Sequence, residues 1–459
     1  MTRLRVEKKY YYRFFCALLL AATATAMYGA GLVLFAQHHG AASLLAEAGR
    51  MPVLLSIYLL LYGLLAKKLK GFKIGVHHKG NIITSQEFAL LLSDAAVVLI
   101  TTGVLGVPDK AGMLALYMLL LFLAQTVVIT ALSILSVNLY RRIFPPLRVV
   151  EIYGDYKNKL FEKVESLKYK YHIVKRIHYT EFDLDAVDVA FDAVLINDIP
   201  SGERNTLLKQ CYAQDKRVYF VPKISDILVK QAEYLTLIET PLCLNRNLGI
   251  SLSQRFLKRT FDLVFSVLAL TLTSPIFAAV AIAIKLDDGG PVFFKQERRT
   301  IGGKPFEIIK FRSMIVNAEN TGRAQLATEA DSRITRVGRV LRKARIDELP
   351  QLINILKGDM SVVGPRPERG ELIEHYSKKI AEFSFRTKMK GGLTGYAQVY
   401  GKYNTTALDK LKLDLVYITN YSLLLDFQII FQTFKVLFQV ESTEGFESEH
   451  QTAIEEDYY

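Results

Sequence analysis

Four long apolar segments in the first third of the chain limit what it can fold into more than any other feature. They cover residues 14–36, 51–66, 88–107 and 113–139. A helix needs about 20 apolar residues to cross the hydrocarbon core of a bilayer, and all but the short second segment meet that length. The first is too long for a cleaved signal peptide, and three more follow it. We therefore predict a membrane protein in which residues 1–146 form an α-helical bundle of four transmembrane helices.

Positive charge is distributed unevenly around these segments. Lysine and arginine cluster before the first segment, between the second and third, and after the fourth, within residues 3–13, 67–79 and 141–148. Because short cytoplasmic loops carry an excess of Lys and Arg, both ends of this block are expected in the cytoplasm, together with everything after residue 140. Asp94 stands near the start of the third segment. It is expected at the membrane interface, although carboxylates inside a membrane are often functional.

Residues 147–245 have a different character. Short apolar runs at 147–153, 193–196 and 218–221 read as buried strands, and segments 157–171 and 204–214 read as helices between them. This alternation predicts a small parallel α/β domain. Gly154 follows the first strand without a GxGxxG pattern, so a nucleotide site is less favoured here than a regulatory or dimerising role.

A fifth apolar segment, at residues 261–284, is long enough to span the membrane but has two features that oppose a simple crossing. Ser274-Pro275 interrupts its middle, and a proline removes a helix hydrogen bond and kinks the axis. Basic residues also flank both of its ends, which the charge rule opposes for a single crossing. We predict a re-entrant helix over residues 255–285, in which the Ser274 hydroxyl helps to satisfy the freed carbonyl groups. A fifth, proline-kinked span is the alternative.

The chemistry-bearing residues lie between positions 285 and 400. Asp347-Glu348 precedes Pro350, an arrangement that is often just a helix cap with an acidic first turn. Here Arg342, Lys343 and Arg345 lie directly upstream, and a carboxylate among cations stays ionised, as a nucleophile must. Two adjacent carboxylates also suit a Mg²⁺ ion that bridges a diphosphate. The net charge of +13 suits nucleic acid, anionic lipid or phosphorylated substrates.

Three further basic residues are candidates for binding phosphate. Arg366 stands between Pro365 and Pro367, which fix its backbone and so reduce the entropy lost when the guanidinium grips a phosphate. A rigid turn before the next helix explains the same residues. Lys310 and Arg312 alternate with Phe311, which is typical of a strand with one basic face that meets anions, lipid headgroups or only solvent.

These motifs together resemble one family, the polyprenyl-phosphate hexose-1-phosphate transferases, in its long form with four N-terminal spans. The resemblance covers residues 251–440 and rests on the order of several blocks: Ser274-Pro275, 310–314, 347–352, 357–361, 364–367 and 392–398. It implies transfer of a hexose-1-phosphate from a UDP-sugar to undecaprenyl phosphate with release of UMP. By this resemblance Asp347 is the nucleophile, Glu348 its partner acid with Mg²⁺ at the pair, and Arg342 and Arg366 bind phosphate.

The resemblance also implies an architecture and a location. It predicts a Rossmann-like domain at 147–245 and an α+β catalytic domain at 246–440, on the cytoplasmic face of the bacterial inner membrane. A homodimer is expected and no nucleic acid partner. Residues 441–459 are acidic and polar and are predicted to be a disordered tail. The stretch from Tyr396 to Gly401 departs from the family's common Trp-Ala-Gln-Val-Asn-Gly, which leaves the transferred sugar open.

Two other functions are compatible with the sequence. One is a nucleotide-sugar glycosyltransferase with a carboxylate base, which would release a nucleoside diphosphate instead of a monophosphate. The other is a catalytically inactive membrane scaffold, against which the presence of Asp347, Glu348, Arg342 and Arg366 argues.

Overall fold

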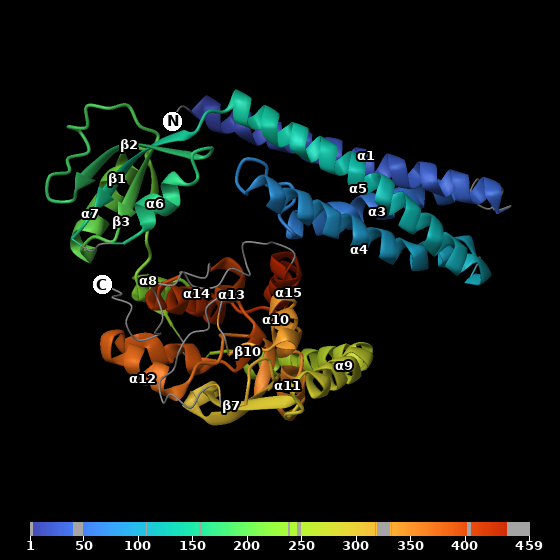
Figure 1. Ribbon diagram of the computed structural model, residues 1–459. Coiled ribbons are helices and arrows are strands. Elements are labelled where there is room, and N and C mark those ends of the chain that lie inside the picture. Colours follow the sequence, from blue (N-terminus) through green and yellow to red (C-terminus); the bar gives the residue numbers. More distant parts are fainter. Residues whose placement is uncertain are drawn as a thin grey trace. The chain divides into compact units, whose positions relative to one another are not determined.

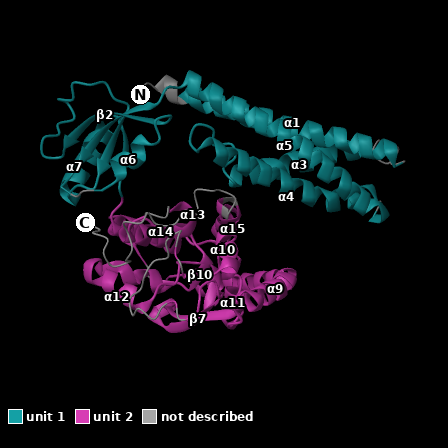
Figure 2. Ribbon diagram, in the orientation of Figure 1, with its two compact units in different colours: residues 1–221 teal, residues 222–459 magenta. Residues whose placement is uncertain are grey.

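The computed structural model describes residues 3–39, 49–106, 108–155, 158–236, 239–245, 249–316, 318, 331, 333–401 and 405–437. The chain divides into two compact units, Met1–Val221 and Pro222–Tyr459 (Figure 2). The predicted division at residues 146, 245 and 440 is finer than this and stays a prediction. The predicted tail, 441–459, lies outside the described residues.

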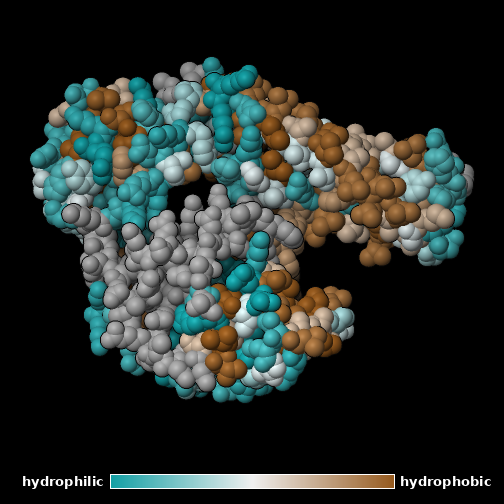
Figure 3. Space-filling model, in the orientation of Figure 1, coloured by the Kyte–Doolittle hydropathy of each residue, from teal (hydrophilic) through white to brown (hydrophobic). Residues whose placement is uncertain are grey.

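The first unit begins with a bundle of four long helices (Figure 1). Each helix packs on two others, since α1 and α4 both contact α3 and α5. Each is long and apolar enough to cross a membrane, and Figure 3 shows hydrophobic side chains covering much of the bundle's length. The predicted helical bundle is confirmed, with α1 at Arg3–His38, α3 at Arg50–Lys68, α4 at Lys79–Leu105 and α5 at Ala111–Ile143.

Asp94 is buried inside the bundle, and its predicted place at the membrane interface stays a prediction. Helix α4 begins at Lys79, well before the apolar run that marks it in the sequence, which places Asp94 near the middle of the helix. The Asp94 carboxylate is 3% exposed and accepts a hydrogen bond of 2.9 Å from the Tyr58 hydroxyl. Gln125 donates to the same hydroxyl at 3.0 Å, so a polar network joins three helices of the bundle.

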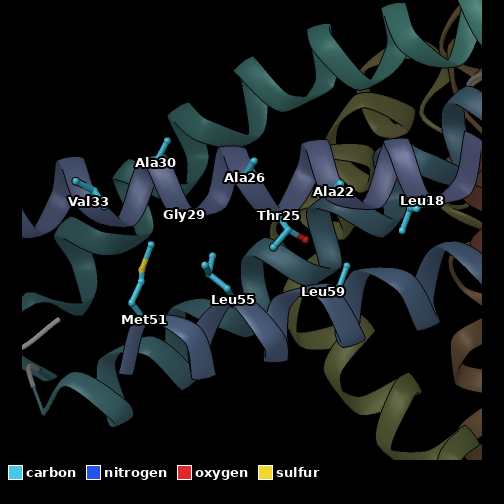
Figure 4. A pocket seen from close by; sticks show the side chains of 10 residues that line it. All are labelled: Leu18, Ala22, Thr25, Ala26, Gly29, Ala30, Val33, Met51, Leu55 and Leu59. Atoms are coloured by element: carbon cyan, nitrogen blue, oxygen red, sulfur yellow. The ribbon is translucent and has the colours of Figure 1, made fainter. Parts of the chain in front are cut away.

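An open groove runs between α1 and α3 (Figure 4). Its volume is about 540 Å³, and Thr25 is the only residue among those lining it that carries a polar side chain. Small residues of α1 form its floor, and Gly29 lies so close to Leu55 and Met51 that a larger residue would press on them. The groove belongs to the first unit, which contains none of the predicted site residues.

The rest of the first unit is a four-stranded parallel sheet with the order β2-β1-β3-β4. Helix α6 packs on the face that presents Leu147 and Leu195, and α7 packs on the opposite face. The predicted parallel α/β arrangement is confirmed. Strand β2 was not predicted, and the predicted helix at 157–171 is shortened to α6. The elements are β1 at Leu147–Tyr153, α6 at Leu160–Glu165, β2 at Tyr171–His178, β3 at Ala193–Asn197, α7 at Ser201–Ala213 and β4 at Arg217–Phe220.

The edge of this sheet where ligands usually bind is filled by the protein's own side chains. Parallel sheets bind ligands beyond the carboxyl ends of their strands, where the strand order reverses, here between β1 and β3. Asn197 donates to Glu151 at 2.8 Å and exchanges hydrogen bonds with Asn158 across that position. A side chain on Gly154 would begin 2.9 Å from the Asp198 carbonyl oxygen. These contacts disfavour a nucleotide at this edge.

The second unit combines helices with pairs of short strands. The pairs β5–β6 and β7–β8 are antiparallel and β9–β10 is parallel. Its largest core gathers around β9, α11 and α14, with buried Val362, Ile355 and Leu411. The elements are α8 (Ile224–Val229), β5 (Glu233–Leu235), β6 (Leu242–Leu244), α9 (Leu252–Asp288), β7 (Phe293–Arg299), β8 (Pro305–Phe311), α10 (Arg336–Lys343), α11 (Gln351–Lys357), β9 (Met360–Val363), α12 (Gly370–Lys379), β10 (Gly391–Thr394), α13 (Tyr396–Tyr400), α14 (Ala407–Thr419) and α15 (Leu423–Leu437).

Helix α9 is the fifth helix long and apolar enough to cross a membrane, and Figure 3 shows hydrophobic side chains over its region of the molecule. It contains Pro275, and the Ser274 hydroxyl donates to the Thr271 carbonyl at 2.8 Å. That carbonyl is the one that Pro275 leaves without a helix partner. The predicted role of the Ser274 hydroxyl is therefore confirmed.

A buried ion pair fastens the first half of α9 to α15. The Lys258 ammonium lies 2.7 Å from the Asp426 carboxylate, and the two side chains are 6% and 0% exposed. The Tyr417 hydroxyl donates to the other Asp426 oxygen at 2.7 Å. A charge buried in this way depends on its partner, because water cannot replace it.

Breaking this pair from one side should therefore destabilise the protein strongly. We expect Lys258→Met to lower the free energy of unfolding by about 3–5 kcal/mol, because it leaves Asp426 buried and unpaired. The double variant Lys258→Met/Asp426→Leu should recover most of that loss, since Tyr417 keeps the Val363 carbonyl as an acceptor at 3.2 Å. The measurement is the thermal midpoint of the full chain in detergent.

The matched control is Lys295→Met in the exposed pair Lys295–Glu307, whose side chains are 57% and 66% exposed. A loss of at most about 1 kcal/mol is expected there. Equal midpoints for Lys258→Met and Lys295→Met would show that the buried pair contributes no more to stability than the exposed pair.

Candidate active site

Asp347 and Glu348 lie on a short 3-10 helix, Ile346–Glu348, between α10 and α11. The turn into it is made by Arg345, whose φ of 53° lies in the left-handed region that side chains other than glycine rarely adopt. Helix α11 is capped by Pro350 without a side-chain hydrogen bond. The capping interpretation of Asp347 is therefore wrong, because the two acids stand one turn ahead of the helix.

The Glu348 carboxylate is held between two cations that come from separate elements. One of its oxygens, Oε1, accepts a hydrogen bond of 2.9 Å from Arg366 and lies 3.5 Å from the ammonium of Lys310 on β8. Burial alone would raise the pKa of Glu348, but the charges of Arg366 and Lys310 bring it well below its usual range. The charge of Glu348 in turn raises the pKa of Arg366. The structure thus brings Lys310 and Arg366 together at Glu348.

Asp347 is in a different electrostatic state from its neighbour. Burial raises its pKa, and the negative charge of Glu348 raises it further, while Lys310, Arg342 and Arg366 oppose the rise. No hydrogen bond or ion pair joins its carboxylate to another described side chain. The sequence predicted that nearby cations would keep this acid ionised. The structure assigns that effect mainly to Glu348 and leaves Asp347 the more basic and unengaged of the two.

The segment that carries Arg366 is fixed by the β9–β10 pair. The Gly364 amide donates to the Thr394 carbonyl, and the Gly392 amide donates to the Pro365 carbonyl, both at 2.9 Å. A side chain on Gly392 would collide with the backbone of Gly364. Glycine is therefore required at 392 for this close approach, which gives the glycine-rich stretch near 391–395 a structural role.

Arg312 does not join the other predicted phosphate-binding residues at Glu348. It lies just beyond β8, is 6% exposed and pairs with Asp288 at the end of α9. Lys310, two residues earlier, faces Glu348. Arg342, on α10, acts on Asp347 through its charge. Ser274 and Pro275 lie on α9.

Sequence analysis missed Arg259, which links α9 to the helix that follows the two acids. Its guanidinium donates to the carbonyl groups of Ile355 and Leu356 at 2.6 and 2.8 Å, at the carboxyl end of α11. On the same helix, Asp262 accepts hydrogen bonds from Ser361 and from the Val362 amide. In the sequence Arg259 is only one member of the basic flank of the apolar segment, and nothing in that pattern distinguishes it from its neighbours.

The two acids offer a partial set of ligands for Mg²⁺. Within the described residues, no three His, Cys, Asp or Glu side chains come together as a metal site. Asp347 is unengaged, and Glu348 has one oxygen in its ion pairs. Mg²⁺ is commonly held by one or two carboxylates together with substrate phosphates. The residues therefore fit an ion that arrives with a diphosphate and do not form a complete site alone.

Comparisons with known proteins identify the family of the region that carries this site. Residues 253–440, which include all the residues of this candidate site, match the bacterial sugar transferase family. An Aeromonas hydrophila UDP-N-acetylgalactosamine-undecaprenyl-phosphate N-acetylgalactosaminephosphotransferase is 41% identical over 56% of this chain and 60% of its own length. An Escherichia coli UDP-glucose:undecaprenyl-phosphate glucose-1-phosphate transferase is 44% identical over 39% of each chain.

The extent of these matches differs between relatives. The two relatives above are matched over about two fifths to three fifths of their length. A Bacillus subtilis protein, the uncharacterized sugar transferase EpsL, is 40% identical over 43% of this chain and 94% of its own length. A short relative is thus covered almost whole by this chain, and the chain belongs to the bacterial sugar transferase family.

Proposed function

We propose that this protein transfers a hexose-1-phosphate from a UDP-sugar to undecaprenyl phosphate, as the first membrane step of exopolysaccharide, capsule or O-antigen synthesis. An Asp347 oxygen attacks the phosphorus that carries the sugar, and the bond from that phosphorus to the bridging oxygen breaks to release UMP. An oxygen of undecaprenyl phosphate then attacks the same phosphorus. The bond to Asp347 breaks, which regenerates the carboxylate and yields a lipid diphosphosugar.

The observation that carries this proposal is the contrast between the two adjacent acids. The negative charge of Glu348 is balanced by Lys310 and Arg366, whereas the Asp347 carboxylate has no bonded partner among the described residues. Among ionised carboxylates the more basic one is the stronger nucleophile, and the charges of Lys310, Arg342 and Arg366 oppose the rise in the pKa of Asp347. Arg366 is 40% exposed at its side chain and Lys310 19%, so both can also meet phosphate oxygens. Positive groups aimed at the reacting phosphate stabilise the charge that develops there.

Magnesium would be held by Asp347 and Glu348 together with the donor's diphosphate. When bound, it would neutralise negative charge on the phosphates. The named activities of the relatives support the UDP-sugar donor and the undecaprenyl phosphate acceptor. Since those names differ in the sugar, we leave the hexose unspecified.

The packing of α9 supports the re-entrant arrangement. A straight helix of its 37 residues would be about 55 Å long. Yet both of its halves pack on one domain, since Phe265 precedes Pro275 and Phe277 follows it, and both belong to core clusters that share Leu349. Asp262 bonds β9 near the start of the helix, and Asp287 accepts from the Val337 amide at its end. A helix that bends at Ser274-Pro275 and returns to the same membrane face explains this.

The remaining architecture follows from that arrangement. We place the catalytic domain on the cytoplasmic face of the bacterial inner membrane, where an isoprenoid acceptor and a nucleotide donor can meet. The parallel sheet of the first unit is the Rossmann-like domain of the long form, and a homodimer is expected. The filled ligand edge of this sheet favours a regulatory or dimerising role for the Rossmann-like domain.

The nucleophile can be tested directly. Asp347→Asn should reduce turnover by at least a thousandfold, because the amide cannot form the acyl phosphate. The measurement is UMP release from a UDP-sugar, combined with capture of protein that carries label from a sugar-labelled donor. Glu374→Gln, an exposed acid on α12, is the control and should behave as the natural protein does. Near-normal turnover by Asp347→Asn would refute the covalent step.

The re-entrant helix can be tested by topology. A reporter fused after residue 286 should read cytoplasmic, because both flanks of α9 stay on one face. A reporter placed after Pro108, between α4 and α5, should read periplasmic and serves as the control. A periplasmic signal after residue 286 would establish a fifth crossing instead.

A further inference from the structure

Arg366 combines a fixed main chain with an accessible side chain. The prolines on either side of it are buried, and the segment is bonded to Thr394 and Gly392 as described above. Its guanidinium, 40% exposed, reaches Glu348 from this base. An arginine that must exchange a carboxylate for a substrate phosphate benefits from such a base, because only the side chain then moves.

A second arginine donates a hydrogen bond to the main-chain carbonyl group of Arg366. Arg386 lies on a 3-10 helix, Ala381–Lys388, and its side chain is 5% exposed. Its Nη2 donates to the Arg366 carbonyl oxygen at 3.1 Å. The same nitrogen lies 2.7 Å from the carboxylate of Asp414 on α14, which is 1% exposed. One guanidinium thus joins the buried α14 to the main chain of Arg366.

Other charges complete this layer. Glu368 lies 3.6 Å from Arg386 and 3.7 Å from Arg298 on β7. Burial raises the pKa of Asp414 to about 6, and Arg386 opposes the rise. The Asp414 carboxylate is therefore in an environment that disfavours its charge, and Arg386 is the cation that compensates it. Truncating Arg386 would remove the hydrogen bond to the Arg366 carbonyl. Truncating Asp414 would leave Arg386 without the partner that holds it at that carbonyl.

We infer that Arg386 and Asp414 are positioning residues, a buried pair that fixes the main chain of Arg366 so that its guanidinium can pass between Glu348 and the donor's phosphate. This inference rests on the proposed function. In the proposed function, neither Arg386 nor Asp414 touches the substrate. Arg386 acts through the Arg366 carbonyl, and Asp414 acts by orienting Arg386.

The geometry makes a lysine a poor substitute at 386. Both contacts of Arg386 come from Nη2, whose two N–H directions are fixed by the guanidinium plane, whereas an ammonium is a compact point charge on a flexible stem. Arg386→Lys therefore keeps the charge beside Asp414 but loosens the hold on the carbonyl. This separates positioning from charge balance.

The experiment is a double-mutant cycle on the full chain in detergent. The variants are Arg386→Lys, Arg366→Lys and the two combined, with Arg336→Lys, an exposed arginine on α10, as the matched control. Three quantities are measured: the KM and kcat for a UDP-sugar, the Kd for UDP as a donor mimic that transfers no sugar, and the thermal midpoint. We expect Arg386→Lys to raise the donor KM and the UDP Kd about tenfold with a small change in midpoint. In the Arg366→Lys background, the same substitution should change both by less than twofold.

Two results would overturn the inference. One is an unchanged donor KM and UDP Kd with a lowered midpoint, which is what a purely structural residue produces. The other is an equal tenfold effect in both backgrounds, which would mean that Arg386 does not act through Arg366. If Arg386→Lys does not fold, Asp414→Asn takes its place in the cycle with the same expected result. Absence of UMP release by the natural protein would defeat the proposed function alone, since the UDP cycle still decides the inference.

Discussion

The second unit is organised around one carboxylate oxygen that would be costly to bury alone. Oε1 of Glu348 meets Arg366 at 2.9 Å and Lys310 at 3.5 Å, and the three residues come from a 3-10 helix, the segment after β9 and strand β8. Removing an ion from water is offset only when its partners are well placed. The pairing therefore fixes how these elements pack against one another, and Asp347, next in sequence to Glu348, is placed by the same contacts.

Helix α9 extends this arrangement to the membrane. Its apolar surface suits lipid, yet Arg259 bonds the carboxyl end of α11, and Asp262 bonds β9. The two acids precede α11, and Arg366 follows β9. These hydrogen bonds join α9 to elements on both sides of the site. In the proposed reaction this link keeps Asp347 at the depth where a lipid phosphate lies.

Sequence patterns predicted the long helices and the parallel sheet, because hydrophobic periodicity is a local property. They failed where the outcome depends on distant partners. Lys258 and Arg259 read as a basic flank of a membrane segment, but one is buried against Asp426 and the other caps α11. Arg312 shares its strand pattern with Lys310, but Asp288 draws it elsewhere. Strand β2 mixes Lys175 and Arg176 into a half-buried edge, so its apolar signal is weak.

The contrast between Asp347 and Glu348 could not be read from their adjacency. Two neighbouring carboxylates in one site repel, and their surroundings decide which of them carries the charge. Here the cations bond Glu348, which lowers its pKa, and the resulting negative charge raises that of Asp347. Glu348 thereby makes its neighbour more basic while it keeps Arg366 and Lys310 in place. Environments that separate the pKa values of paired acids assign them different roles. In the proposed reaction this separation gives Asp347 the role of the nucleophile and Glu348 that of the fixed charge that prepares it.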